Sequence, residues 1–265
     1  MKIYISADME GVAGVTHWDE TEVGKPGYEQ FRTQMAAEVR AACEGATRAG
    51  ATEILVNDAH DTGRNLTPAD IPAAARLLRG WTSHPLAMVE ELDPSFTGLV
   101  LVGYHAPAGS AGTPLAHSMS SQLHALEING RPASEFLLAA YGAGLVGVPL
   151  LFVSGDEATC AEAQELNPGI GTFAVNRGAG GATVSLAAER AVAGIRDAVA
   201  AALTRDPNTC RISLPDKFAL EVRYRDHPSA YRASFYPRAS LISPRTVGFE
   251  TSDFMEVLRF LLFVA

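Results

Sequence analysis

The chain is poor in cysteine and in basic residues. Its only cysteines, Cys43, Cys160 and Cys210, lie far apart and lack CxxC spacing, which excludes a disulfide framework and a zinc-finger set. Lys and Arg number 21 against 30 Asp and Glu, so the net charge is −9. An acidic surface repels phosphate groups. We therefore expect no nucleic-acid partner and no attraction to an anionic membrane.

Long hydrophobic segments are also scarce. The first residues, MKIYISAD, do not complete a secretory signal, because Asp8 interrupts the apolar run. The unpaired cysteines are typical of a reducing compartment, so we expect a cytoplasmic protein. Residues 136–155 carry no charge, but glycines and Pro149 divide them into a helix end, a GAGLVG turn and a buried strand. The turn spells GxGxxG in the wrong order for a dinucleotide site, after a helix and before a strand.

Short apolar runs alternate with helical patterns along most of the chain. The predicted strands are 2–7, 53–57, 75–78, 99–103, 122–128 and 150–154. The predicted helices are 28–49, 87–92, 134–145, 157–166 and 185–203. This alternation predicts an α/β fold with a largely parallel sheet and helices on both of its faces.

The composition changes at Pro215, where charged residues become frequent again. Strands near 219–224 and 246–251 flank a shorter predicted helix, and Asp253 is the expected N-cap of a last helix. Chains of this length usually form one large domain or a domain with a smaller partner. We expect an α/β domain over residues 1–214 and a smaller C-terminal α+β part over residues 215–265.

Three predicted strands end in side chains that bind metals. Asp8 and Glu10 follow the first strand, His60 follows the second, and His105 follows the strand at 99–103. Ligands of α/β sheets gather at the carboxyl ends of strands, and carboxylates with imidazoles suit divalent transition metals. Taken alone, each residue is more typical of a helix cap, a turn or a hydrogen-bonded loop histidine than of a metal ligand. Together they predict a metal site.

Other polar residues near these strand ends are weaker candidates. Asn57 and Asp58 precede His60, and a metal-bound histidine usually donates its second N–H to such a group. Asp58 is equally suited to cap a turn or to face water. His17 is a candidate for lining a pocket. The remaining histidines outside the motifs are expected to be structural: His84, His124 and His227.

Two further residues are ambiguous from the sequence alone. His117 lies in the glycine- and serine-rich segment 109–121, where it is either an acid–base group or part of a plain surface loop. Glu135 opens a predicted helix, where an acidic side chain also complements the helix dipole. No GxSxG motif surrounds a serine, which disfavours a serine hydrolase.

Five segments resemble the D-aminopeptidase family of the Bacillus dipeptide-operon type, in the family's order and at similar spacing: MKIYISADMEGVAG, LVNDAH, GYHA, HSMS and INGRPASE. The resemblance covers nearly the whole chain. It implies two zinc ions held by five ligands, with Asp8 bridging the ions: Asp8, Glu10, His60, His105 and Glu135. It also implies that His117 is catalytic. Residues 107–110 and the region after Asp216 depart from the family's pattern, which leaves specificity and assembly open.

The resemblance further implies an α/β domain with a smaller second domain, and a homo-oligomeric decamer of stacked rings around an internal chamber. The implied reaction releases N-terminal, D-configured amino acids from short peptides, using metal-activated water and His117 as acid and base. One alternative is a metal-dependent phosphohydrolase, although Glu10 stands where the dehalogenase-type motif has a second Asp. The other is a non-catalytic, ring-forming protein that binds peptides or metal.

Overall fold

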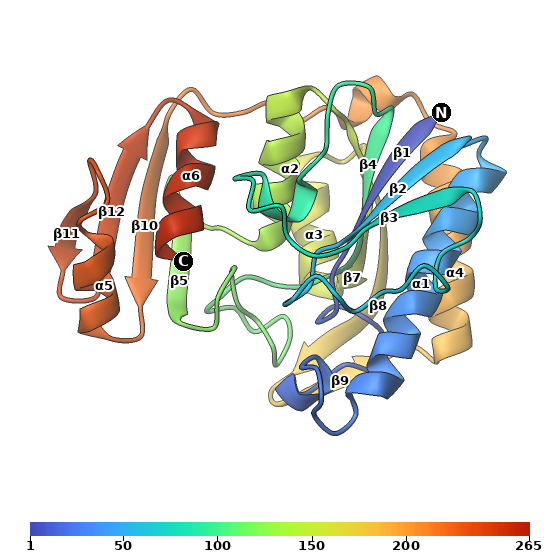
Figure 1. The fold of residues 1–265 in the computed structure, drawn as a ribbon, viewed down its shortest axis with the longest axis horizontal. Helices are drawn as coiled ribbons and strands as arrows, with labels where there is room; N and C mark the ends of the chain where they lie inside the picture. Colours follow the sequence, from blue (N-terminus) through green and yellow to red (C-terminus); the bar gives the residue numbers. More distant parts are fainter.

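The computed structural model describes residues 1–265, which form two β-sheets lying side by side (Figure 1). The strands of the larger sheet are β1 Lys2–Ala7, β2 Glu53–Asp58, β3 Ala75–Leu78, β4 Gly98–Tyr104, β7 Leu150–Asp156, β8 Gly171–Ala179 and β9 Ala182–Ser185. Their spatial order is β3-β2-β1-β4-β7-β8-β9. All neighbours pair in parallel except β8 and β9, which form an antiparallel hairpin.

The smaller sheet is antiparallel and draws its strands from two distant parts of the chain. These strands are β5 Leu123–Ile128, β6 Arg131–Pro132, β10 Phe218–Tyr224, β11 Ser240–Ser243 and β12 Thr246–Thr251. Their order is β11-β12-β10-β5-β6. β5 and β6 form a hairpin around Asn129 and Gly130, both with positive φ. The smaller part is therefore built from residues 123–132 as well as from the C-terminal region after residue 214.

Helices cover both faces of the larger sheet, as the sequence predicts. The helices are α1 Tyr28–Arg48, α2 Glu135–Val146, α3 Glu157–Leu166, α4 Ala188–Leu203, α5 His227–Ala233 and α6 Phe254–Val264. Helices α1 and α4 pack against each other on one face, α2 and α3 lie on the other, and α5 and α6 accompany the smaller sheet (Figure 1). Three short 3-10 helices complete the fold: η1 Trp18–Glu20, η2 Ala87–Val89 and η3 Pro207–Cys210.

Two hydrophobic cores hold these layers together. Along β1, Ile3 and Ile5 point into a core shared with α1 and α4, whereas Tyr4 points into a second core. The second core of 40 residues continues from the α2 side of the larger sheet into the smaller sheet. The two sheets are thus joined by one continuous apolar layer. No helix is both long and apolar enough to cross a bilayer.

Several local predictions need correction. The GAGLVG segment is not a turn, because α2 continues to Val146 and ends at the left-handed cap Gly147. Gly144 lies within this helix, and the position requires glycine because a Cβ there would collide with Leu214 and the Ile212 carbonyl. Residues 185–187 are not helical, since β9 ends at Ser185, and the short helix at 87–92 contracts to η2. Strands β6, β8, β9 and β11 were not predicted.

Candidate metal centre

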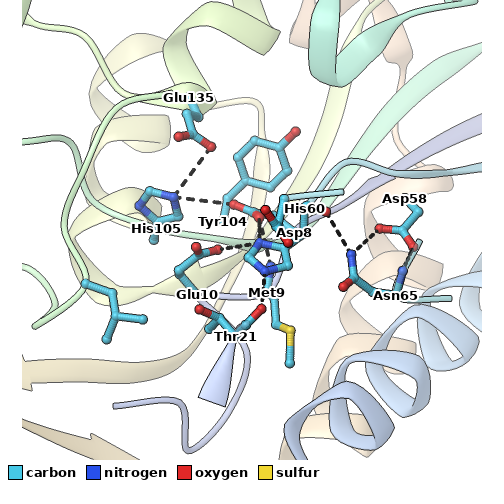
Figure 2. Close-up of polar contacts among 12 residues, drawn as sticks. Asp8, Met9, Glu10, Thr21, Asp58, His60, Asn65, Tyr104, His105 and Glu135 are labelled. Atoms are coloured by element: carbon cyan, nitrogen blue, oxygen red, sulfur yellow. Dashed lines mark hydrogen bonds and ion pairs between the residues drawn. The ribbon is translucent and has the colours of Figure 1, made fainter. Parts of the chain in front are cut away.

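The carboxyl ends of three adjacent strands bring four predicted ligands together (Figure 2). Asp8 and Glu10 follow β1, His60 follows β2, and His105 follows β4. Their side chains are almost completely buried. Gly103 has φ +75°, and a Cβ there would strike the carbonyl of Asp8, so glycine allows β4 to pass close beneath the loop that holds Asp8.

Asp8 lies between two groups of side chains. His60 Nδ1 is 3.2 Å from Asp8 Oδ1 and 3.0 Å from Glu10 Oε2. On the other side, His105 Nε2 is 3.4 Å from Asp8 Oδ2 and 3.5 Å from Glu135 Oε2. Glu135 is the first residue of α2, whose N-cap Ser134 accepts a hydrogen bond from the backbone N–H of Leu137. The two carboxylate oxygens of Asp8 therefore face different histidines.

His117 completes the cluster from the loop between β4 and β5. Its Nε2 is 3.4 Å from Glu135 Oε1 and 3.9 Å from Glu10 Oε1. Its ring stacks on His105 with centroids 4.3 Å apart, and it forms a T-shaped pair with the Trp18 ring. The His117 side chain is 14% exposed, whereas that of His105 is fully buried. Of these two stacked rings, His117 is the one open to the cavity.

Backbone carbonyls orient all three imidazoles. One ring nitrogen of each histidine lies within hydrogen-bond distance of a carbonyl oxygen: His60 Nε2 with Thr21, 2.8 Å; His105 Nδ1 with Ala106, 3.0 Å; His117 Nδ1 with Leu115, 3.0 Å. Because a carbonyl only accepts, that nitrogen carries the proton. The other nitrogen of each ring faces the carboxylates, and when that nitrogen is deprotonated its lone pair can bind a metal.

Several buried polar atoms of the cluster have no hydrogen-bond partner. They are Asp8 Oδ2, Glu10 Oε2 and His105 Nε2. Buried polar atoms in proteins are nearly always hydrogen-bonded. Three unpaired atoms in one cluster therefore indicate a site whose oxygen and nitrogen lone pairs bind a ligand. The set of imidazole nitrogens and carboxylate oxygens fits a divalent transition metal.

The electrostatics also favour added positive charge. Burial, together with the Glu10 carboxylate, raises the pKa of Asp8 to about 8. Burial alone would lower the pKa of His60 and His105, but the carboxylates of Glu10 and Glu135 outweigh it and raise both pKa values well above their ordinary range. The three neighbouring carboxylates thus favour protonation of Asp8, His60 and His105, because their negative charges repel one another and attract positive charge. A bound cation would satisfy the same charges.

The side chains next to His60 support it differently from the prediction. Neither Asn57 nor Asp58 hydrogen-bonds to its ring, because the ring nitrogen that faces away from the carboxylates is paired with the Thr21 carbonyl. Asp58 instead accepts hydrogen bonds from Asn65, whose side-chain amide also donates to the His60 carbonyl (Figure 2). Asn57 donates to the Met88 carbonyl, away from the ring. Asp58 therefore acts on the backbone that carries His60.

Some residues of the site carry no signal in the sequence. The backbone N–H of Met119 donates to Glu135 Oε1 at 2.6 Å, from a left-handed conformation with φ +61°. Trp18 lies against His117, whereas the neighbouring His17 is exposed and caps η1. The three histidines expected to be structural lie outside the cluster; His124 is exposed on β5.

The cluster opens into a cavity of about 590 Å³ between the two sheets. Besides the cluster, acidic Glu22 and Asp61 and the indoles of Trp18 and Trp81 line it. Arg225, which follows β10 of the smaller sheet, is the only Arg or Lys side chain in its wall. The cavity thus has a strongly acidic floor and a single permanent cation at the smaller sheet.

Comparisons with known proteins identify the family that the chain resembles. The family model described as D-aminopeptidase matches residues 1–263. A D-aminopeptidase from Bacillus subtilis (strain 168) is 34% identical over 264 residues, covering 99% of this chain and 96% of the relative. The solved structure of the Zn-dependent D-aminopeptidase DppA from Bacillus subtilis, described as a self-compartmentalizing protease, is 33% identical with a TM-score of 0.91. It matches over 100% of this chain and 96% of its own.

Proposed function

The chain belongs to the D-aminopeptidase family, and from this membership we propose that it releases N-terminal D-amino acids from short peptides in a zinc-dependent reaction. One observation carries the proposal: three imidazoles and three carboxylates converge in one cavity, with each imidazole oriented by a backbone carbonyl. The Zn-dependence stated for the similar solved structure supports zinc as the metal.

Two ions per chain fit the arrangement of donors. Asp8, Glu10 and His60 would hold one ion, and Asp8, His105 and Glu135 the other, because the two oxygens of Asp8 face the two histidines. When bound, a metal pair polarises the scissile carbonyl and lowers the pKa of water. The orphaned Asp8 Oδ2, Glu10 Oε2 and His105 Nε2 support this assignment.

His117 is the proposed acid–base group. Its Nδ1–H is directed at the Leu115 carbonyl, so the Nε2 lone pair points toward the carboxylates and the cavity. That nitrogen can accept the proton of the attacking water and return it to the amide nitrogen as the C–N bond breaks. Stacking on His105 and the edge contact with Trp18 hold the ring in this orientation.

The charges of the cavity suit a short peptide. Its protonated N-terminal amine is attracted to the carboxylates of Glu22 and Asp61, which are not among the proposed metal ligands, and its C-terminal carboxylate is attracted to Arg225 on the opposite sheet. Folded proteins have few free termini and do not enter a cavity of about 590 Å³. We therefore assign short peptides with a free carboxylate as the substrate class.

Metal content and peptide hydrolysis test the proposal together. Protein purified without added metal should contain about two zinc ions per chain by mass spectrometry. It should hydrolyse D-Ala-D-Ala faster than L-Ala-L-Ala, lose activity to a chelator and regain it with zinc. Metal without cleavage of either peptide would favour the peptide- or metal-binding alternative. Magnesium-dependent hydrolysis of a phosphate ester, without peptidase activity, would favour the phosphohydrolase.

Assembly is part of the proposal. The similar solved structure is described as self-compartmentalizing, which supports a homo-oligomer in which the active sites face an enclosed space. A decamer of the 28.0 kDa chain has a mass of 280 kDa, ten times that of the chain. Sedimentation at several concentrations measures this mass directly, and a monomer at all of them would refute the assembly.

A further inference from the structure

A second, smaller cavity adjoins the metal centre. It has a volume of about 60 Å³, and hydrophobic residues make up nine of its 11 lining residues. Met88, Met119 and Glu135 line this side pocket and the larger cavity alike. The side pocket therefore lies against the carboxylate that contacts both His105 and His117.

The two sheets build this side pocket jointly. Leu138 and Ala139 of α2 form one wall, and Leu258, Leu261 and Leu262 of α6 form the opposite wall. Helix α6 belongs to the smaller sheet, which supplies none of the six residues of the metal centre. The apolar wall faces no charged side chain except Glu135, whose oxygens are already engaged with Met119 N–H and the histidines.

We propose that the side pocket binds the side chain of the substrate's N-terminal residue, and that Leu262 limits its size. This inference rests on the proposed function. In an aminopeptidase the N-terminal residue carries the scissile carbonyl, so of all the substrate's side chains its own lies nearest to Glu135 and His117. An apolar wall excludes charged side chains, because burying a charge without a partner is costly.

The volume sets the size of the accepted group. An apolar protein cavity of about 150 Å³ holds one benzene molecule, so about 60 Å³ holds only a few non-hydrogen atoms. A methyl or isopropyl group fits this space, whereas a leucine or phenylalanine side chain does not. The side pocket therefore selects small aliphatic residues.

Two neighbouring residues of α6 provide a matched test. Leu262 lines the side pocket and is 42% exposed, while Phe263 is 73% exposed and does not line it. Leu262→Ala should deepen the pocket without opening the core. It should raise kcat/KM for D-Leu-D-Ala relative to D-Ala-D-Ala by about tenfold, since hydrophobic pockets discriminate by ~10–200-fold per methylene. Phe263→Ala should leave this ratio unchanged.

Binding of free D-alanine and D-leucine, measured by calorimetry on the metal-loaded protein, separates this inference from the proposed function. If Leu262→Ala shifts the binding ratio toward D-leucine and no variant cleaves peptides, the side pocket binds the amino-acid side chain as proposed but the peptidase proposal is wrong. If peptides are cleaved but neither ratio changes in Leu262→Ala, or both change equally in Phe263→Ala, the side pocket assignment is wrong.

Discussion

The larger sheet is buried on both faces, whereas the smaller sheet exposes one of them. Every residue of β4 and β7 is buried, while residues of β10 alternate between buried and exposed. Parallel strands end together at one edge, so β1, β2 and β4 can deliver ligands to one point. Neighbouring antiparallel strands end at opposite edges. The smaller sheet accordingly supplies cavity walls, through Arg225 and α6, rather than ligands.

The largest effect is expected where both halves of the metal centre meet. Asp8→Ala removes the carboxylate that faces both His60 and His105, so both metal ions should be lost together. Peptidase activity should fall below detection, and metal content by mass spectrometry should approach zero. Glu221→Gln, on the exposed face of β10 and outside the cavity wall, is the control and should retain metal and activity. One ion per chain at full occupancy in Asp8→Ala would show that Asp8 does not serve both sites.

His117→Ala should lower turnover by less than Asp8→Ala does. Loss of an acid–base group typically costs ~10²–10⁴-fold in turnover. Zinc content and thermal stability should be unchanged, because the proposed ligands remain. His124→Ala, on the exposed face of the smaller sheet, is the matched control and should behave as wild type. Turnover of His117→Ala near the wild-type rate would remove this histidine from the mechanism.

The next prediction concerns the stability of the larger sheet's core rather than catalysis. Glu38 of α1 is fully buried beneath the loop after Glu10 and accepts the backbone N–H of Ala13. Burial raises the pKa of Glu38 to about 7. The unfolded chain releases this proton at its ordinary pKa near 4.5, so wild-type stability is lost progressively from about pH 4.5 to pH 7.

Glu38→Gln should remove this pH-dependent loss. Relative to wild type, its free energy of unfolding should increase as the pH rises and level off above pH 7, with a total gain of about 3 kcal/mol. Urea unfolding at pH 5 and pH 8 measures the change. Glu189→Gln, an exposed position on α4, should show no such trend. An equal difference at both pH values would show that the pKa of Glu38 is not raised.

The smallest effect is expected at the smaller sheet. Arg225→Gln should lower kcat/KM for D-Ala-D-Ala by about three- to tenfold, mainly through KM, because a solvent-exposed ion pair contributes little. The C-terminal amide of the same peptide should show no change. Arg223→Gln, exposed on β10, is the control. An equal loss for the amide would mean that Arg225 does not recognise the carboxylate.

The contrast between the parallel larger sheet and the antiparallel smaller sheet also explains which features could be predicted from the sequence. The apolar runs of the parallel sheet predict β1, β2, β4 and β7 closely, and the polar residues after three of them predict the cluster of Asp8, Glu10, His60 and His105. Glu135 and His117 are different, because a helix N-terminus and a glycine-rich loop have ordinary explanations. Only the resemblance to a family assigns them a role.

Features that depend on the backbone or on distant segments could not be predicted. The carbonyls that orient the imidazoles carry no side-chain signal, and the Thr21 carbonyl replaces the expected Asn57 or Asp58. The glycines of α2 indicate a turn locally, but close packing of Leu214 requires one of them within the helix. The partner of the β5–β6 hairpin lies some ninety residues away in sequence, as in the pair of Leu220 with Ile128.

That hairpin makes the chain's last segment indispensable to the metal centre. His117 and Glu135 flank the hairpin in sequence, and Ser118 Oγ donates to the Ala133 carbonyl, tying its two ends together. A protein truncated at residue 214 would keep all six residues of the centre yet lose β10, leaving the edge of β5 bare. The catalytic end of the larger sheet therefore depends for its shape on residues that supply none of its ligands.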